Sequence, residues 1–106
     1  MSTLSSRAIQ HITCEQLKSH LDDSLNVTII DIRDPQSYAA GHIEGAQRID
    51  NSNVEEFVSN TDKSIPLVVC CYHGNSSQSA ADYFNSQGFE SSASLDGGYE
   101  RWKTLY

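Results

Sequence analysis

The residues best suited to nucleophilic chemistry lie in the segment Cys71-Tyr72-His73-Gly74-Asn75-Ser76, whose first residue, Cys71, closes the apolar run Leu67 to Cys71. An apolar strand, a short loop and the start of a helix, in that order, direct several backbone N–H groups at one point. Gly74 and Asn75 are residue types that tolerate the positive φ of such a tight loop. We therefore expect Cys71 to lie in a nest of backbone amides.

This position predicts a reactive Cys71. Amide donors and the partial positive charge of a helix N-terminus favour the thiolate, and they can lower a cysteine pKa by several units from about 8.5. A buried, inert cysteine is the alternative, and we prefer it for Cys70, because adjacent strand residues point to opposite faces and only the last one can enter the loop. Cys14, on an expected helix, receives the same interpretation.

A metal site is a second interpretation of the cluster formed by Cys70, Cys71 and His73. Structural zinc sites use paired ligands such as C-x-x-C, with a second pair further along the chain. The remaining histidines show no such pairing: His11, His20 and His42. We therefore expect no metal.

Length and charge limit the possible functions. A chain of 106 residues is expected to form a single domain over 1–106, with the Ser-rich lead-in Met1 to Ser6 flexible. Fourteen acidic residues against seven basic ones give a net charge of -7, which disfavours nucleic acid and anionic membranes as partners. Three cysteines do not form a disulfide framework and favour the cytoplasm, and no stretch approaches the ~20 apolar residues of a membrane span.

Short apolar runs alternate with amphipathic segments along the chain. The expected strands are Ala8 to Ile12, Val27 to Asp31, Leu67 to Cys71 and Ser92 to Leu95. The expected helices are Thr13 to Leu21, Pro35 to Ala40, Asn53 to Asn60, Ser77 to Gln87 and Tyr99 to Leu105. This alternation predicts an α/β domain whose parallel sheet is covered by helices on both faces, with ligands at the carboxyl ends of the strands.

Helix ends support these assignments. Thr13 and Gln16 have the spacing of a capping box at the start of the first helix. Pro35 stands in the first turn of the second helix and Gly41 just past its end, the usual asymmetry of these two residue types.

Three blocks of this sequence resemble the rhodanese family, and more narrowly the single-domain thiosulfate sulfurtransferases of the GlpE type. The blocks are Asp31 to Ala46 (DIRDPQSYAAGHIEGA), Cys71 to Ser77 (CYHGNSS) and Leu95 to Trp102 (LDGGYERW). The resemblance covers essentially the whole chain. It implies a sheet of five parallel strands, the fifth being the short piece Gln47 to Asp50, which the apolar pattern alone does not predict.

The resemblance also implies a reaction. Cys71 would attack the outer sulfur of thiosulfate, sulfite would leave, and the persulfide would be held by the N–H groups of Tyr72, His73, Gly74, Asn75, Ser76 and Ser77. Cyanide, a small thiol or a thioredoxin-like dithiol protein would then accept the sulfur, in two half reactions without a cofactor. Many rhodaneses carry Arg or Lys in this loop, whereas this one has neither, so anion binding would depend on the amides.

The other motif residues are expected to have structural roles. Asp31 and Arg33 are predicted to form an ion pair, and Gly41 and His42 to form a turn. His73 is expected to be an exposed loop residue rather than a base. Trp102 is expected to anchor the last helix in the core, beside the motif glycines Gly97 and Gly98.

Two other functions use similar chemistry. A cysteine-based phosphatase or arsenate reductase also holds a thiolate in an anion-binding loop, but C-x5-R phosphatases need a bidentate guanidinium where this chain has Ser77. A persulfide relay or sulfur-binding module fed by a partner protein would use the same Cys71. The sequence leaves this last alternative open.

Overall fold

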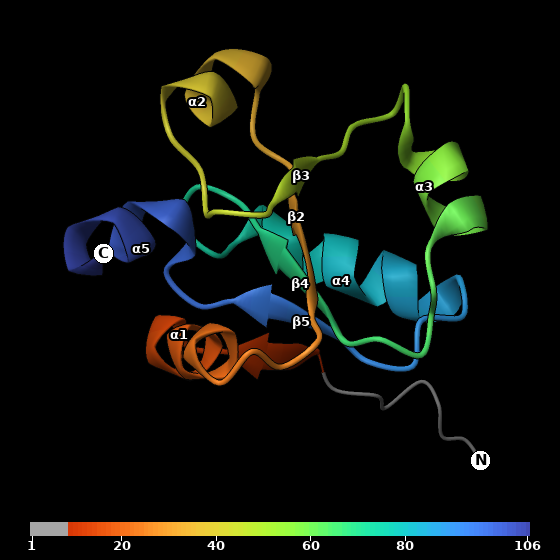
Figure 1. The fold of residues 1–106 in the computed structure, drawn as a ribbon. Helices are drawn as coiled ribbons and strands as arrows, with labels where there is room; N and C mark the ends of the chain where they lie inside the picture. Colours follow the sequence, from red (N-terminus) through yellow and green to blue (C-terminus); the bar gives the residue numbers. More distant parts are fainter. Residues whose placement is uncertain (1–8) are drawn as a thin grey trace.

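The structure, a computed structural model, describes residues 9–106 as five strands and five helices in strict alternation (Figure 1). The strands are β1 (Gln10–Ile12), β2 (Thr28–Asp31), β3 (Gln47–Arg48), β4 (Leu67–Cys70) and β5 (Ser92–Leu95). The helices are α1 (Cys14–Asp22), α2 (Pro35–Ala40), α3 (Val54–Asn60), α4 (Ser76–Ser86) and α5 (Gly98–Leu105). The expected lead-in Met1 to Ser6 and the first residue of the expected strand, Ala8, lie outside the described residues.

All five strands belong to one parallel sheet in the order β1-β5-β4-β2-β3, which confirms the predicted fold class. Its central strand is β4, every residue of which is buried. The fifth strand implied by the resemblance exists as β3 but has only two residues, because its ladder with β2 ends at Arg48. The chain after β4 therefore emerges in the middle of the carboxyl edge of the sheet.

Two apolar clusters, one on each face of the sheet, reflect the alternation of side chains along the strands. Val68 and Cys70 point to the face that α1 and α5 cover, where Leu17 and Trp102 pack. Leu67 and Val69 of the same strand point to the opposite face. There α3 and α4 supply Phe57, Ala81 and Phe84. The expected cover of helices on both faces is therefore present (Figure 1).

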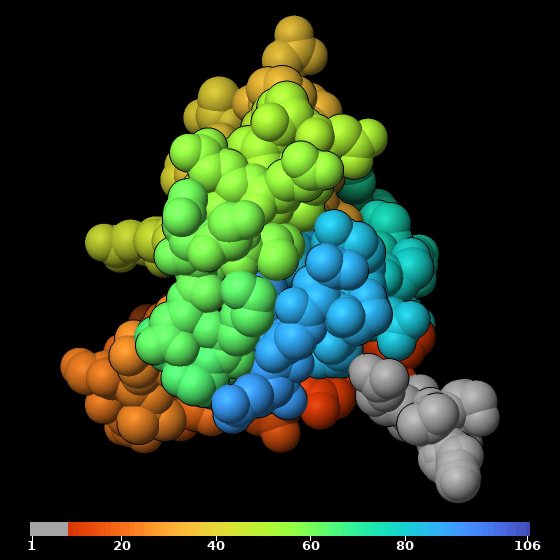
Figure 2. Space-filling view, turned by 90° about the vertical axis from the view of Figure 1, so that its right-hand side faces the viewer, coloured from red at the N-terminus to blue at the C-terminus, as the bar shows by residue number. Residues whose placement is uncertain are grey.

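Aromatic packing joins α3 to the end of α4. The ring of Phe57 stacks on Phe89 with centroids 5.9 Å apart and meets Phe84 edge-on at 5.8 Å. The amide of Glu90 donates to the carbonyl of Lys63 nearby. Figure 2 shows this side of the molecule, where the green segment that includes α3 lies against the blue segment that follows α4. Within the described residues, no helix has the length and apolar character needed to cross a membrane.

The helix ends agree with the predicted signals. Thr13 caps α1 through the amide of Gln16 at 3.0 Å, and the Gln16 side chain accepts from the Thr13 amide at 2.9 Å, which completes the capping box. Gly41 follows α2 as expected, but its φ of 168° is extended backbone rather than the left-handed conformation. Gly41 is instead a site of close approach, because a Cβ there would lie 2.7 Å from Tyr99 Oη.

Replacing Thr13 by alanine removes a helix cap and is expected to lower the free energy of unfolding by about 1 kcal/mol. Thr104→Ala is the matched control, since the Thr104 hydroxyl only donates to the Arg101 carbonyl within α5 and is exposed. Its effect should stay within about 0.5 kcal/mol. Urea titration of both variants measures the difference, and equal losses would show that the capping box does not stabilise α1.

Candidate active site

Cys71 is the first residue after β4 and is 1% exposed. The expected strand included Cys71, but the ladder ends one residue earlier. The Cys70 carbonyl still accepts from the Ile32 amide, whereas the Cys71 carbonyl accepts from the Tyr99 amide of α5 at 2.8 Å. Because Cys71 leaves the ladder, it belongs to the loop between β4 and α4.

The Cys71 sulfur lies among three hydrogen-bonding groups of that loop. The amides of Gly74 and Ser77 donate to Sγ at 3.2 and 3.3 Å, and Ser77 Oγ lies 3.1 Å from it. Gly74 has the expected positive φ, 90°. Asn75 instead has helical backbone (φ -94°, ψ -62°) as the N-cap residue of α4, so of these two tolerant residue types only Gly74 adopts the positive φ.

These hydrogen bonds determine the ionisation of Cys71. Burial by itself raises the pKa of the thiol, because it removes water from the charged form. The hydroxyls of Ser77 and Ser76 and the amides of Ser77 and Gly74 oppose this, and together they hold the pKa of Cys71 below its ordinary value. A thiolate at this position is therefore favoured, as the sequence predicted.

The other two cysteines are buried in the opposite environment. Cys70 and Cys14 both lie in the apolar cluster under α1 and α5 and are not exposed at all. Burial raises the pKa of Cys70 far above its ordinary value, and the nearby Asp31 carboxylate adds to the effect. Burial likewise raises the pKa of Cys14. Both are protonated thiols at neutral pH, in agreement with the inert role expected for them.

Helix α5 holds the loop from the side opposite α4. The amides of Tyr99 and Glu100 donate to the carbonyls of Cys71 and Tyr72 at 2.8 and 3.0 Å. This approach requires glycine, since a Cβ on Gly98 would lie 2.5 Å from the Tyr72 carbonyl oxygen and 2.6 Å from that of Cys71. Gly74 meets the same segment from the loop side, since a Cβ there would lie 2.9 Å from the amide nitrogen of Gly97. The absence of side chains at Gly98 and Gly74 lets the start of α5 contact the active-site loop.

Arg33 and Asp31 form the expected ion pair next to Tyr99. Both side chains are buried, Arg33 Nη2 lies 2.8 Å from the Asp31 carboxylate, and its Nε contacts both carboxylate oxygens. The guanidinium also donates to the Gly41 carbonyl at 2.7 Å and lies 4.3 Å from the centroid of the Tyr99 ring. Its charge is thus balanced by Asp31, and its N–H groups tie the end of β2 to the end of α2.

The remaining motif residues occupy three different settings. The Tyr72 hydroxyl donates to the Asp34 carboxylate, which anchors the loop to the start of α2, while the neighbouring His73 is exposed. His42 stacks on Tyr38 with centroids 3.8 Å apart. Trp102 is 8% exposed and belongs to the core under α5.

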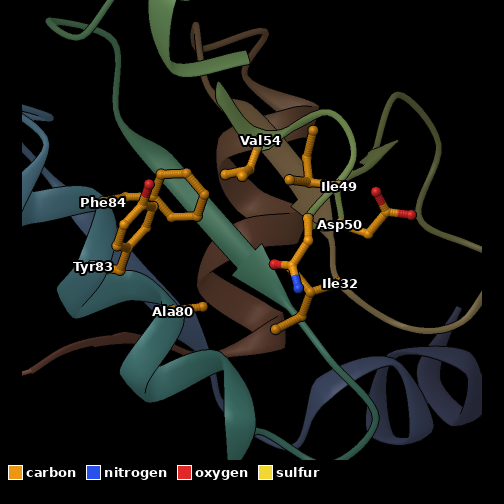
Figure 3. Close-up of a pocket in the computed structure, with 8 residues that line it drawn as sticks. Ile32, Ile49, Asp50, Val54, Ala80, Tyr83 and Phe84 are labelled. Carbon is orange, nitrogen blue, oxygen red and sulfur yellow. The ribbon is translucent and has the colours of Figure 1, made fainter. Parts of the chain in front are cut away.

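An apolar groove also lies along the outer side of α4. Figure 3 shows Ala80, Tyr83 and Phe84 of α4 facing Ile49 and Val54 across it. Ile32, Asp50 and Asn51 complete the lining, which does not include Cys71. The groove continues the apolar cluster of that face and lacks the converging donors of the cysteine loop, so we assign the chemistry to the loop.

Comparison with known proteins agrees with this geometry. Residues 13–105 match the rhodanese-like domain family. Thiosulfate sulfurtransferase GlpE of Pseudomonas paraeruginosa is 52% identical over 101 residues, covering 95% of this chain and 90% of the relative. The same-named protein of Pseudomonas fluorescens is 58% identical over 78 residues, covering 74% of this chain and 72% of the relative.

The chain belongs to the rhodanese-like domain family. Two crystal structures share the fold of this rhodanese-like domain. The Alr3790 protein of Anabaena superposes with a TM-score of 0.80 at 31% identity, covering 89% of this chain and 86% of the other. A rhodanese-like domain protein of Staphylococcus aureus gives 0.78 at 26% identity, covering 88% and 90%. The resemblance seen in the three sequence blocks is confirmed.

Sequence reasoning missed two residues at the centre of this rhodanese-like domain. Ser94 of β5 is fully buried, and its hydroxyl lies 2.7 Å from Ser77 Oγ. The Tyr99 amide donates to the Cys71 carbonyl, and the Tyr99 ring lies against the Arg33 guanidinium. Only the register of β5 beside β4 and the direction of α5 bring them there. A small polar residue within a buried strand was the single available signal for Ser94.

Gly98→Ala is expected to slow the alkylation of Cys71 by iodoacetamide at pH 7 and to move the midpoint of its pH profile upward by about one unit, the equivalent of about 1.4 kcal/mol. The new Cβ would collide with the carbonyls of Cys71 and Tyr72, so the loop must move and its donors leave the sulfur. Gly45→Ala is the matched control, because Gly45 also has a positive φ (88°) but nothing lies within 4 Å of its Cβ position. Mass spectrometry of the labelled Cys71 measures both rates, and equal slowing would assign the effect to backbone strain alone.

Proposed function

We propose that this rhodanese-like domain is a thiosulfate sulfurtransferase that carries sulfur on Cys71 as a persulfide. The observation that carries the proposal is the buried Cys71 sulfur with two amides and one hydroxyl directed at it. Relatives named as thiosulfate sulfurtransferases are 52% identical along nearly the whole chain, which supports the same activity here.

The first half reaction follows from the chemistry of a thiolate. The Cys71 sulfur attacks the outer sulfur of thiosulfate, a new S–S bond forms, and the S–S bond of thiosulfate breaks as sulfite leaves with the electron pair. The amides of residues 72–77 balance the negative charge of the resulting persulfide. The hydroxyls and amides that lower the pKa of Cys71 take the place of a base, because they favour loss of the thiol proton to solvent.

In the second half reaction a nucleophile removes the outer sulfur. Cyanide, a small thiol or a thioredoxin-like dithiol protein attacks that sulfur and releases the Cys71 thiolate. Each of these acceptors supplies its own electron pair, so the cycle balances without a cofactor, and ping-pong kinetics are expected.

Phosphate chemistry is less compatible with this loop. A C-x5-R phosphatase has an arginine at the sixth position after the cysteine, whereas Ser77 occupies it here and is buried against Sγ. The buried arginine of the first block, Arg33, donates to Asp31 and Gly41 instead. We also propose the cytoplasm as the compartment, because all three cysteines are free thiols and a reducing environment maintains that state.

Sulfur loading is the direct test. If a covalent persulfide forms, incubation with thiosulfate should increase the intact mass by one sulfur atom, about 32 Da. Cyanide should then remove this sulfur as thiocyanate. Cys71→Ser should gain no sulfur, whereas Cys70→Ala should gain it normally because Cys70 lies on the opposite face. Loading that persists in Cys71→Ser would refute the assignment. Failure to load from thiosulfate, with loading from a protein persulfide, would instead identify a relay.

Ionic strength should affect thiosulfate but not a neutral reagent. With a net charge of -7 on the chain and no Arg or Lys in residues 72–77, the protein repels a dianion at long range. Raising the ionic strength from about 0.01 M to about 0.15 M shortens the screening length from about 30 to about 8 Å. The second-order rate of loading from thiosulfate should therefore rise.

Alkylation of Cys71 by uncharged iodoacetamide over the same salt range is the control and should not change. Stopped-flow or quenched mass measurements give both rates. A loading rate that falls with salt would mean that local attraction by the loop outweighs the repulsion from the net charge.

A further inference from the structure

A chain of hydroxyl groups extends from the Cys71 sulfur into the core. Ser77 Oγ lies 3.1 Å from Sγ, and the Ser94 hydroxyl lies 2.7 Å from Ser77 Oγ. All three side chains are buried, with Cys71 1% exposed and the two serines not exposed at all. They come from three different places: the loop, α4 and β5.

The proton count decides how this chain must be oriented. A thiolate sulfur can only accept, so the single Ser77 proton must point at Sγ when Cys71 is ionised. The Ser77 oxygen is then free to accept from Ser94, whose own proton completes the sequence Ser94 to Ser77 to Cys71. When Cys71 is a neutral thiol, Ser77 can instead donate to Ser94. The orientation in which Ser77 donates to Sγ therefore stabilises the Cys71 thiolate, whereas the orientation in which Ser77 donates to Ser94 is compatible only with the neutral thiol.

The ionised orientation gains more from Ser94 than the neutral one. Hydrogen bonds to a charged acceptor are roughly twice as strong as neutral ones, and a donor is strengthened when it accepts a bond itself. Within the described residues the Ser94 hydroxyl bonds to Ser77 Oγ and not to Sγ or the loop amides, so any effect of Ser94 on the sulfur passes through Ser77.

Ser92 provides an internal comparison on the same strand. Ser92 and Ser94 pair with Leu67 and Val69, so both face the α4 side of the sheet, and both are fully buried. The Ser92 hydroxyl, however, has no hydrogen-bond partner among the described residues. Both serines are therefore buried, but of the two only Ser94 is connected to Cys71, through its hydrogen bond with Ser77.

We propose that Ser94 is a positioning residue, which orients the Ser77 hydroxyl so that it donates to the Cys71 thiolate. The proposal deepens the proposed function, because a fixed donor below the sulfur prepares it for attack on a sulfur donor. It assigns a role to the strand next to β4, in addition to the loop residues.

The test is the pH dependence of Cys71 alkylation by iodoacetamide, measured without thiosulfate. Ser94→Ala should move the midpoint of the profile to higher pH by about half to one unit, the range expected for one hydrogen bond. Ser92→Ala should leave the midpoint unchanged, although it also removes a buried hydroxyl from β5. An unchanged midpoint in Ser94→Ala, or an equal shift in both variants, would overturn the proposal.

A second pair of variants separates the hydroxyl from its volume. Thr and Val have the same shape, so Ser94→Thr should retain the midpoint of the original chain while Ser94→Val should shift it as Ser94→Ala does. This comparison remains valid if the added methyl group costs stability, because both variants bear it. Equal midpoints for Thr and Val would show that the hydroxyl has no effect.

A double-mutant cycle tests the route through Ser77. Ser77→Ala alone should raise the midpoint, and adding Ser94→Ala should produce no further rise, because the hydroxyl that Ser94 orients is already gone. Additive shifts would contradict action through Ser77. The alkylation profile uses no sulfur donor, so a failure of thiosulfate loading would refute the proposed function while leaving this inference open to its own measurements.

Discussion

A buried sulfur that must carry a negative charge requires hydrogen-bond donors, and this requirement organises the active site. At 1% exposure Cys71 has lost nearly all contact with water, and burial alone would keep it protonated. The donors of the loop reverse that preference. Their geometry depends on Gly74, whose positive φ turns its amide toward the sulfur, and on the start of α4, which brings the amide and hydroxyl of Ser77 to the same point.

The loop in turn depends on its neighbours in the fold. Helix α5 donates two amides to its carbonyls, and the absence of a side chain at Gly98 allows that contact. Tyr99 then bridges to Arg33, whose guanidinium joins β2 to the end of α2 through Asp31 and Gly41. The first and third sequence blocks, which carry no nucleophile, therefore act as the support of the second. Their residues lie far apart in the chain and meet at the carboxyl edge of the sheet.

The proposed reaction requires an acidic protein to bind a small dianion, and the same arrangement bears on that requirement. The charge of Arg33 is compensated by Asp31 within the core, and the loop itself contains neither Arg nor Lys. In the proposed reaction, attraction for the anion would come from amide dipoles, which act over short distances, while the net charge of -7 acts over long ones. This combination suits a compact sulfur donor that reaches the amides closely, and it lacks the bidentate guanidinium that phosphate chemistry requires.

The sequence by itself determined four of the five strands, the five helices, the choice of Cys71 over Cys70 as the loop cysteine, and the capping box of α1, because each depends on residues near one another in the chain. It did not determine the end of β4, where the Cys71 carbonyl accepts from the Tyr99 amide of α5, or the two-residue β3, which is defined by its pairing with β2. Ser94 could not be found from sequence, because only the register Val69 with Ser94 brings its hydroxyl to Ser77. Local chemistry could be read from the chain, whereas the supports of the thiolate depended on tertiary contacts.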